Sequence, residues 1–111
     1  MTSSMRMMKL DCYQVAKEIA VRVHEAKIRD TELRDQATRA AKSTFLRLAE
    51  GLPNEGPGMR RKYFVEANNS LHEVAAAVDL AEALSAIDSA QAAAIIGLSA
   101  RLKPMIRALL R

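Results

Sequence analysis

Few residues of this chain could carry out metal or acid–base chemistry. It has two histidines, His24 and His72, and one cysteine, Cys12. A carboxylate-bridged metal centre in a helical protein requires a glutamate three residues before a histidine on the same helix face. The positions three and four residues before the two histidines are uncharged: Ala20, Val21, Asn68 and Asn69. We therefore expect no metal and no cofactor, and we place each histidine either in a seam between helices of neighbouring copies or on the surface.

Nucleophilic catalysis has equally little support. Cys12 falls on an apolar stripe with helical spacing, where a small buried thiol is the usual outcome. The segment Gly56-Pro57-Gly58 follows no strand and lacks the Gly-Lys-Ser/Thr ending of a phosphate-binding loop, so it is interpreted as a connector. We predict no catalytic residue, no small-molecule substrate and no enzymatic activity. The alternative is a hydrolase or transferase with a site between subunits.

The basic residues support one functional interpretation, which is weak, sequence-independent RNA binding through positive charge. Arg60-Arg61-Lys62 opens a predicted helix, whose N-terminal dipole adds positive potential. Three further basic residues lie on the outward side of the preceding helix, although Glu32 and Asp35 share that side. The candidate nucleic-acid-binding residues are Arg39, Lys42, Arg47, Arg60, Arg61 and Lys62. The alternative is that these charges serve only solubility.

Charge is distributed unevenly along the chain, which carries a formal net charge of +4. No lysine or arginine occurs between Lys62 and Arg101, a stretch that holds several acidic residues. We expect neighbouring helices to pair their charges. The alternative is a folded protein that presents one basic and one acidic side.

The composition indicates one helical domain. The chain has 111 residues, of which 50% are hydrophobic and only 4% aromatic, with few glycines and prolines. Apolar periodicity predicts helices over 10–28, 31–51, 59–84 and 89–110, after a flexible segment at 1–9. Asp30 or Thr31 and then Asp88, with Gln91 as its capping-box partner, are the predicted N-caps, and Gly51 suits the position after a helix end. We predict an all-α, antiparallel, up-down-up-down four-helix bundle over residues 10–111.

The predicted core stripe of the first helix runs from Cys12 to Ala26, and that of the third helix begins with Met59 and Tyr63. Both helices also carry a second, partly apolar seam on the opposite side. In a monomer both seams would be exposed to solvent, so we predict that they pack against other copies in a homo-oligomer. The alternative is that they are scattered apolar residues on the surface of a monomer. The candidate interface residues are Tyr13, Lys17, Val21, His24, Ile28, Val65, Asn69, His72, Ala76 and Ala83.

No apolar run suits a signal peptide or a membrane span, because charges interrupt every candidate segment. We therefore expect a soluble cytoplasmic protein without a membrane partner.

Several short motifs carry a family resemblance. The chain contains Leu10-Asp11-x-Tyr13-x-x-Ala16, Leu33-x-x-Gln36-x-x-Arg39-Ala40-Ala41-x-Ser43, Ala49-Glu50-Gly51 and Phe64-x-x-Ala67-x-x-Ser70-Leu71-x-Glu73. In this order it resembles the ribosomal RNA intervening-sequence proteins, small bacterial four-helix bundles related to the accessory variability determinant of diversity-generating retroelements. It departs from their pattern at Arg47, where asparagine is usual, and at Asn69, where glycine is usual.

The resemblance implies an antiparallel bundle that assembles into a ring-like homopentamer, with RNA or an RNA-bound protein as a partner. The polar residues that would carry any role shared with the family are Gln36, Arg39, Ser43, Glu50, Ser70 and Glu73. A structural role is the alternative for them: Arg39 would pair with Glu50 or Glu73, and the two serines would permit close helix packing.

Overall fold

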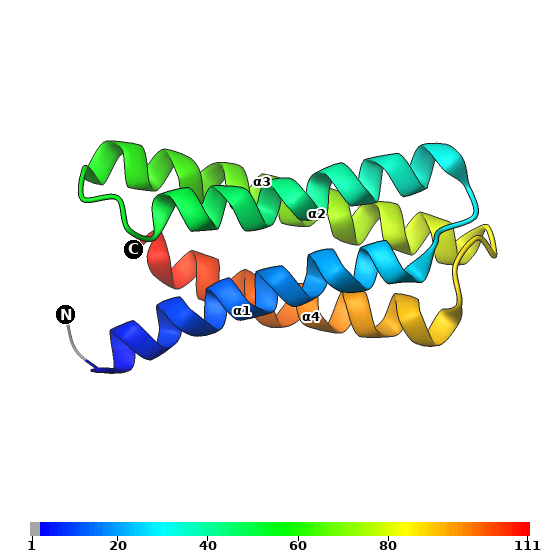
Figure 1. The fold of residues 1–111 in the computed structure, drawn as a ribbon, viewed down its shortest axis with the longest axis horizontal. Helices are drawn as coiled ribbons and strands as arrows, with labels where there is room; N and C mark the ends of the chain where they lie inside the picture. Colours follow the sequence, from blue (N-terminus) through cyan, green and yellow to red (C-terminus); the bar gives the residue numbers. More distant parts are fainter. Residues whose placement is uncertain (1–2) are drawn as a thin grey trace.

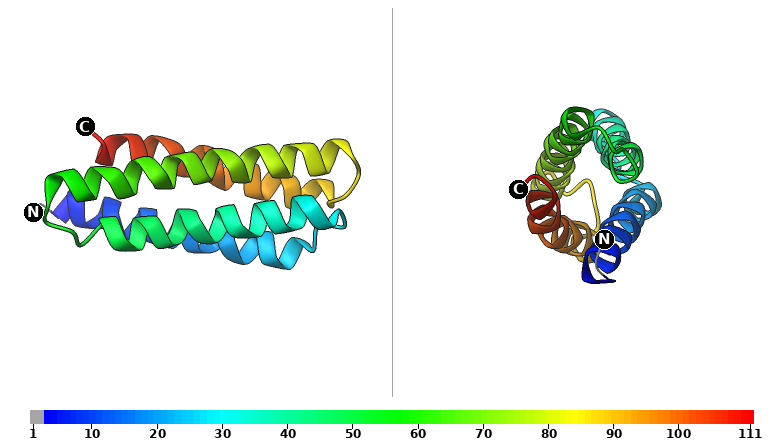
Figure 2. Two further views of the ribbon diagram at one scale, coloured as in Figure 1. Left: turned by 90° about the horizontal axis from the view of Figure 1, so that it is seen from above. Right: turned by 90° about the vertical axis from the view of Figure 1, so that its left-hand side faces the viewer.

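The computed structural model describes residues 3–111, and the part of the chain that it describes forms four α-helices and no strand. The helices are α1 (Ser3–Ala26), α2 (Thr31–Gly51), α3 (Pro57–Ala83) and α4 (Ser89–Leu109). Consecutive helices run in opposite directions (Figure 1), and seen end-on they surround one core (Figure 2). Contacts run around the ring α1–α2–α3–α4–α1, without diagonal contacts. The predicted four-helix bundle is confirmed, with extents of 44 × 23 × 19 Å.

The core consists mainly of aliphatic side chains from all four helices. The predicted stripe of α1 is buried throughout, from Cys12 to Ala26. In α3, however, Phe64 is buried (1% exposed), whereas Met59 is 47% exposed. Met59 lies in the first turn of α3, and this turn stands at one end of the bundle (Figure 1). The apolar stripe of α3 therefore begins one helical turn later than predicted.

Helix α1 begins well before the predicted boundary at residue 10. It starts at Ser3, so residues 3–9 of the expected flexible segment are helical, and Met1 and Thr2 lie outside the described residues. Methionine, arginine and lysine in this stretch all favour helix. Met8 and Lys9 are half-buried and share a small cavity with Ala108 and Leu109 of α4. Packing against the end of α4 thus extends α1 toward the N-terminus.

Helix α1 also ends earlier than predicted, and this changes the role of Ile28. Lys27 has a positive φ of 48°, which ends the helix after Ala26 and turns the chain inward. Ile28 is consequently fully buried in the core. Its assignment to an oligomer interface was wrong, because the helical periodicity used to place it does not extend to residue 28.

The predicted N-caps are confirmed. The carboxylate of Asp30 accepts a hydrogen bond from the backbone N–H of Leu33 at 2.9 Å, and that of Asp88 accepts from the N–H of Gln91 at 3.2 Å. Each carboxylate satisfies a backbone donor that the first turn of a helix leaves free. Asp30 and Asp88 thereby fix where α2 and α4 begin.

Gly51 has a different role from the one predicted. It is the last residue of α2, and no glycine among the described residues has a positive φ, so it is not a left-handed helix terminator. A Cβ atom at Gly51 would lie only 2.7 Å from Cε1 of Phe64. The absence of a side chain therefore lets the end of α2 approach the Phe64 ring on α3.

Within residues 3–111, none of the helices combines the length and the apolar character needed to cross a lipid bilayer.

Candidate functional site

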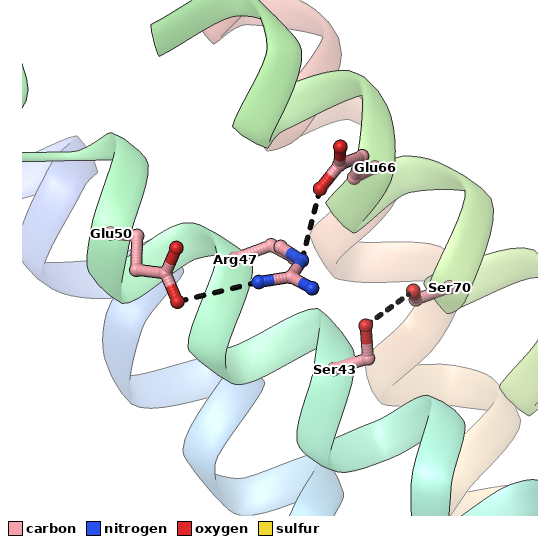
Figure 3. A network of polar contacts seen from close by, with 5 residues as sticks. All are labelled: Ser43, Arg47, Glu50, Glu66 and Ser70. Carbon is pink, nitrogen blue, oxygen red and sulfur yellow. Dashed lines mark hydrogen bonds and ion pairs between the residues drawn. The ribbon is translucent and has the colours of Figure 1, made fainter. Parts of the chain in front are cut away.

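Polar side chains bridge α2 and α3, the two helices that carry most of the family-like motifs. The Ser70 hydroxyl lies 2.9 Å from the Ser43 hydroxyl, and Nε of Arg47 lies 3.0 Å from a carboxylate oxygen of Glu66 (Figure 3). Arg47 also pairs with Glu50 on its own helix at 3.4 Å. The arrangement joins α2 and α3 through polar contacts.

The arginine in this network is not the one that was expected. Glu50 pairs with Arg47, and the expected ion pairs of Arg39 with Glu50 or Glu73 are absent from the described residues. Arg39 is exposed and lines a shallow surface recess with Asp35 and Thr38. Gln36 and Glu73 are exposed too, so the six motif residues form no single cluster.

Cys12 lies in the core, as expected, and has no exposed surface. Burial, with a smaller contribution from the negative charge of Asp11, raises the pKa of its thiol from 9.0 to about 11. The reactive form of a cysteine is the thiolate. At neutral pH this side chain is therefore a protonated core residue and a poor nucleophile.

The histidines do not converge with other ligands. His24 and His72 are both exposed, on α1 and α3, which do not contact one another. Across residues 3–111, no group of three or more histidine, cysteine, aspartate or glutamate side chains could hold a metal ion.

The six candidate nucleic-acid-binding residues fall into two groups. Arg39, Lys42 and Arg47 follow α2, and of these Arg47 is engaged by two glutamates, which neutralise its charge. Arg60, Arg61 and Lys62 lie in the first turns of α3, at the end of the bundle. The second group is therefore better suited to bind phosphate.

Two further basic residues, Lys9 and Arg111, lie at this end of the bundle and were not predicted as binding residues from the sequence. Arg60 and Arg111 line two adjoining small cavities, one of which also includes Lys9 and the other Arg61. Arg61 donates a hydrogen bond to the carbonyl oxygen of Leu110 at 3.0 Å, and none of these four residues forms an ion pair within residues 3–111. We refer to Lys9, Arg60, Arg61, Lys62 and Arg111 as the basic end. The antiparallel topology brings these residues together from α1, from α3 and from the segment that follows α4.

The opposite end of the bundle has the opposite charge. It contains the α1–α2 and α3–α4 connections (Figure 1). Acidic residues outnumber basic ones there: Glu25, Asp30, Glu32, Asp35, Asp79, Glu82 and Asp88 accompany Arg22, Lys27, Arg29 and Arg34. Charge is thus separated along the long axis of the bundle, between its two ends. Alternate helices reverse direction, so segments far apart in sequence gather at each end.

Most of the predicted interface residues are accessible. On α1, Val21 is 48% exposed, and on α3, Val65 is 37% exposed. Tyr13 is half-buried, because its ring packs against Phe45 with 4.9 Å between centroids. The other predicted interface residues, apart from the buried Ile28, are all exposed: Lys17, His24, Asn69, His72, Ala76 and Ala83.

A groove of about 410 Å³ between α3 and α4 was not predicted. Its apolar lining comes from Leu71, Ala75, Ile96 and Ala100. His72, Ser99 and Lys103 complete it, so its lining includes a histidine and a lysine and no acidic side chain. Ser99 is only 4% exposed, and its hydroxyl has no hydrogen-bond partner. The sequence signal was Ser99 itself, a polar residue at a core position of α4.

Comparison with known proteins adds one match. Residues 8–108 match the family model described as 23S rRNA-intervening sequence protein. A search of curated proteins finds no match. The matched region includes all of α2, α3 and the α3–α4 groove, together with nearly all of α1 and α4.

Proposed function

The chain belongs to the family of 23S rRNA-intervening sequence proteins, and from this premise we propose that it is a non-enzymatic helical scaffold that forms a homo-oligomer and binds RNA weakly through the phosphate backbone. The family description associates these proteins with ribosomal RNA genes. For this chain we propose direct contact with RNA or with an RNA-bound protein.

The observation that carries the RNA proposal is the basic end. Its lysine and arginine side chains come from α1, α3 and the residue Arg111 after α4, and they have no carboxylate partner among the described residues. Unpaired cations attract phosphate strongly, because binding releases the counterions that surround a nucleic acid. Few aromatic side chains are available for base stacking, which favours contacts with the backbone over recognition of a base sequence.

Assembly would multiply this charge. The exposed apolar side chains Leu10 and Val21 on α1 and Val65 and Leu80 on α3 support a homo-oligomer. A ring in which bundles stand side by side places every basic end on the same face. A pentamer, which the resemblance to the family implies, would present five such ends to one RNA molecule.

The nucleophile candidates support a non-enzymatic role. Cys12 is buried with a raised thiol pKa. Ser43 and Ser70 hydrogen-bond to one another. Neither arrangement supplies an activated nucleophile.

The test is a mobility-shift assay with a labelled structured RNA at low and high salt. We expect binding at low salt that weakens steeply as salt is raised. Arg60→Glu combined with Arg61→Glu should weaken binding without unfolding the bundle. The matched comparison is Lys62→Glu at the basic end against Lys27→Glu at the opposite end, because both residues are exposed and each change alters the charge equally.

Binding that falls for Lys62→Glu but not for Lys27→Glu supports the basic end as the RNA-binding surface. Equal affinities for all variants would refute that assignment. If the correctly assembled protein shows no shift even at low salt, the RNA proposal fails.

A further inference from the structure

We propose that the α3–α4 groove binds a small amphipathic anion, an aliphatic carboxylate whose chain lies along the groove and whose head group pairs with Lys103. This inference goes beyond the proposed function, which names only macromolecular partners. It does not depend on assembly, because the groove shares only His72 with the predicted interface residues.

The groove has the size and the lining of a small-molecule site. Its volume of about 410 Å³ falls within the range of roughly 300–1,000 Å³ that is typical of such sites. Most of the lining is aliphatic and comes from Leu71, Ala75, Ile96 and Ala100. Small-molecule sites combine a lining of this kind with a few polar groups that orient the ligand. The groove therefore suits a ligand that is mainly apolar.

The Ser99 hydroxyl is a buried polar group without a hydrogen bond. Among the described residues, Thr44 and Ser99 are the two buried polar side chains. The Thr44 hydroxyl donates to the carbonyl oxygen of Ala40 at 2.8 Å, one turn earlier on its own helix, whereas the Ser99 hydroxyl makes no such bond. Buried hydroxyl groups are normally hydrogen-bonded, because leaving one unpaired is costly. A ligand oxygen in the groove would accept a hydrogen bond from Ser99.

Lys103 supplies the charge that selects an anion. It follows Ser99 by four positions, so the two residues lie on the same face of α4, and both line the groove. Lys103 is half-buried and forms no ion pair within residues 3–111, and α4 itself contains no acidic residue. Hydrogen bonds from an ammonium group to a carboxylate are stronger than those between neutral groups. One ammonium group and one hydroxyl on the same face suit a single carboxylate.

The remaining lining indicates that the body of the ligand is an aliphatic chain. No phenylalanine or tyrosine among the described residues lines the groove, which favours an aliphatic chain over an aromatic ring. Ile96 precedes Lys103 by seven positions on α4, a distance of about 10 Å at about 1.5 Å per residue, which matches an extended chain of about eight carbons. Octanoate is therefore the probe of matching length, with its carboxylate at Lys103 and its methyl end near Ile96.

Isothermal titration calorimetry of the full chain with sodium octanoate tests the site, and we expect one site per chain. Lengthening the carboxylate from hexanoate to octanoate should strengthen binding by about two- to fourfold for each added methylene group, because each leaves water for an apolar lining.

Lys103→Met keeps an unbranched side chain and removes the charge. It should weaken octanoate binding by roughly tenfold, because the charged hydrogen bond is lost, and should change binding of the uncharged octan-1-ol by less than about twofold. Lys42→Met, the same substitution at an exposed position of α2, is the matched control and should leave both affinities unchanged. Ser99→Ala should weaken octanoate binding several-fold and leave the bundle folded.

A further variant, Ala100→Leu, fills the groove at an exposed position with a residue that favours helix. We expect it to abolish binding of both octanoate and octan-1-ol, with the helical circular dichroism spectrum retained. The inference is overturned if the wild type does not bind octanoate, or if Ala100→Leu binds it as the wild type does. Equal losses for Lys103→Met and Lys42→Met would also overturn it, since they would show attraction of an anion to a basic protein without a defined site.

Discussion

Arg29 ties the two connections at one end of the bundle together. Its guanidinium donates a hydrogen bond to the carbonyl oxygen of Ser85 at 2.6 Å, and its backbone N–H donates to the carbonyl oxygen of Ala86 at 2.7 Å. Ser85 has a positive φ of 56°, in the left-handed region. The α1–α2 connection is thus attached to the α3–α4 connection, which is more than fifty residues away in sequence.

Replacing Arg29 with alanine should lower the free energy of unfolding by roughly 0.5–1.5 kcal/mol, because the side-chain bond is lost and the backbone bond remains. Urea denaturation measures this change. Lys42→Ala, at an exposed position of α2, is the control and should shift stability by less than about 0.5 kcal/mol. Equal effects of the two substitutions would show that the Arg29 bond contributes nothing specific.

Gly51→Ala should destabilise the bundle by roughly 1–3 kcal/mol, because the added methyl group would overlap the Phe64 ring. Gly97→Ala is the matched comparison. A Cβ atom at Gly97, inside α4, meets nothing within 4 Å, so this change should stabilise by about 0.5–1 kcal/mol through helix propensity. Thermal and urea denaturation of both variants should give changes of opposite sign; changes of the same sign would contradict the close approach of α2 and α3.

Stability should depend on pH through Cys12. The folded thiol keeps its proton up to a pKa of about 11, whereas the unfolded thiol loses it near 9.0. The unfolded state therefore binds fewer protons between these values, and the contribution of Cys12 to stability is complete below pH 9 and is lost as the pH rises toward 11. The limiting slope is about 1.4 kcal/mol per pH unit.

Cys12→Ala isolates this effect from the titration of lysine and tyrosine. Urea denaturation in the presence of reductant, at pH 8 and pH 10.5, should show the wild type losing more stability than the variant over this interval. Parallel losses would mean that the buried thiol does not titrate differently in the folded state.

Arg47→Asn introduces the residue that is usual in the family and removes both ion pairs. Because the Arg47 side chain remains 40% exposed, the expected loss is only about 0.2–1 kcal/mol, and it should shrink at high salt. Arg39→Asn, which removes an arginine without an ion pair, is the control. A loss at Arg47 that does not change between low and high salt would point to packing of its aliphatic stem instead of its charge.

Helix number, order and most of the core follow from the apolar periodicity, because a buried stripe imposes its spacing on the sequence. The Asp30 and Asp88 caps were predictable for a similar reason, since their side chains act on amides three residues away. Ile28 was wrongly assigned to an exposed helix face because Lys27, with its positive φ, ends the helix before it. Positive φ usually marks a glycine, and Lys27 is not one, so the sequence does not indicate this helix end.

Contacts between helices were harder to predict. Arg47 and Glu66 are far apart in sequence, and nothing local indicates which arginine of α2 reaches α3. The basic end depends on Lys9 and Arg111, which approach Arg60 only because of the topology. The α3–α4 groove likewise depends on how two helices pack, and Ser99 was its one sign in the sequence.

The separation of charge along the 44 Å axis has a consequence for encounters in solution. At physiological ionic strength electrostatic fields decay over about 8 Å, so an approaching molecule senses only the pole that faces it. The net charge of +4 is therefore divided unevenly, with an excess of positive charge at one end and an excess of negative charge at the other. A polyanion would be attracted in one orientation and repelled in the other, so that electrostatic steering selects the direction of approach before any atom touches.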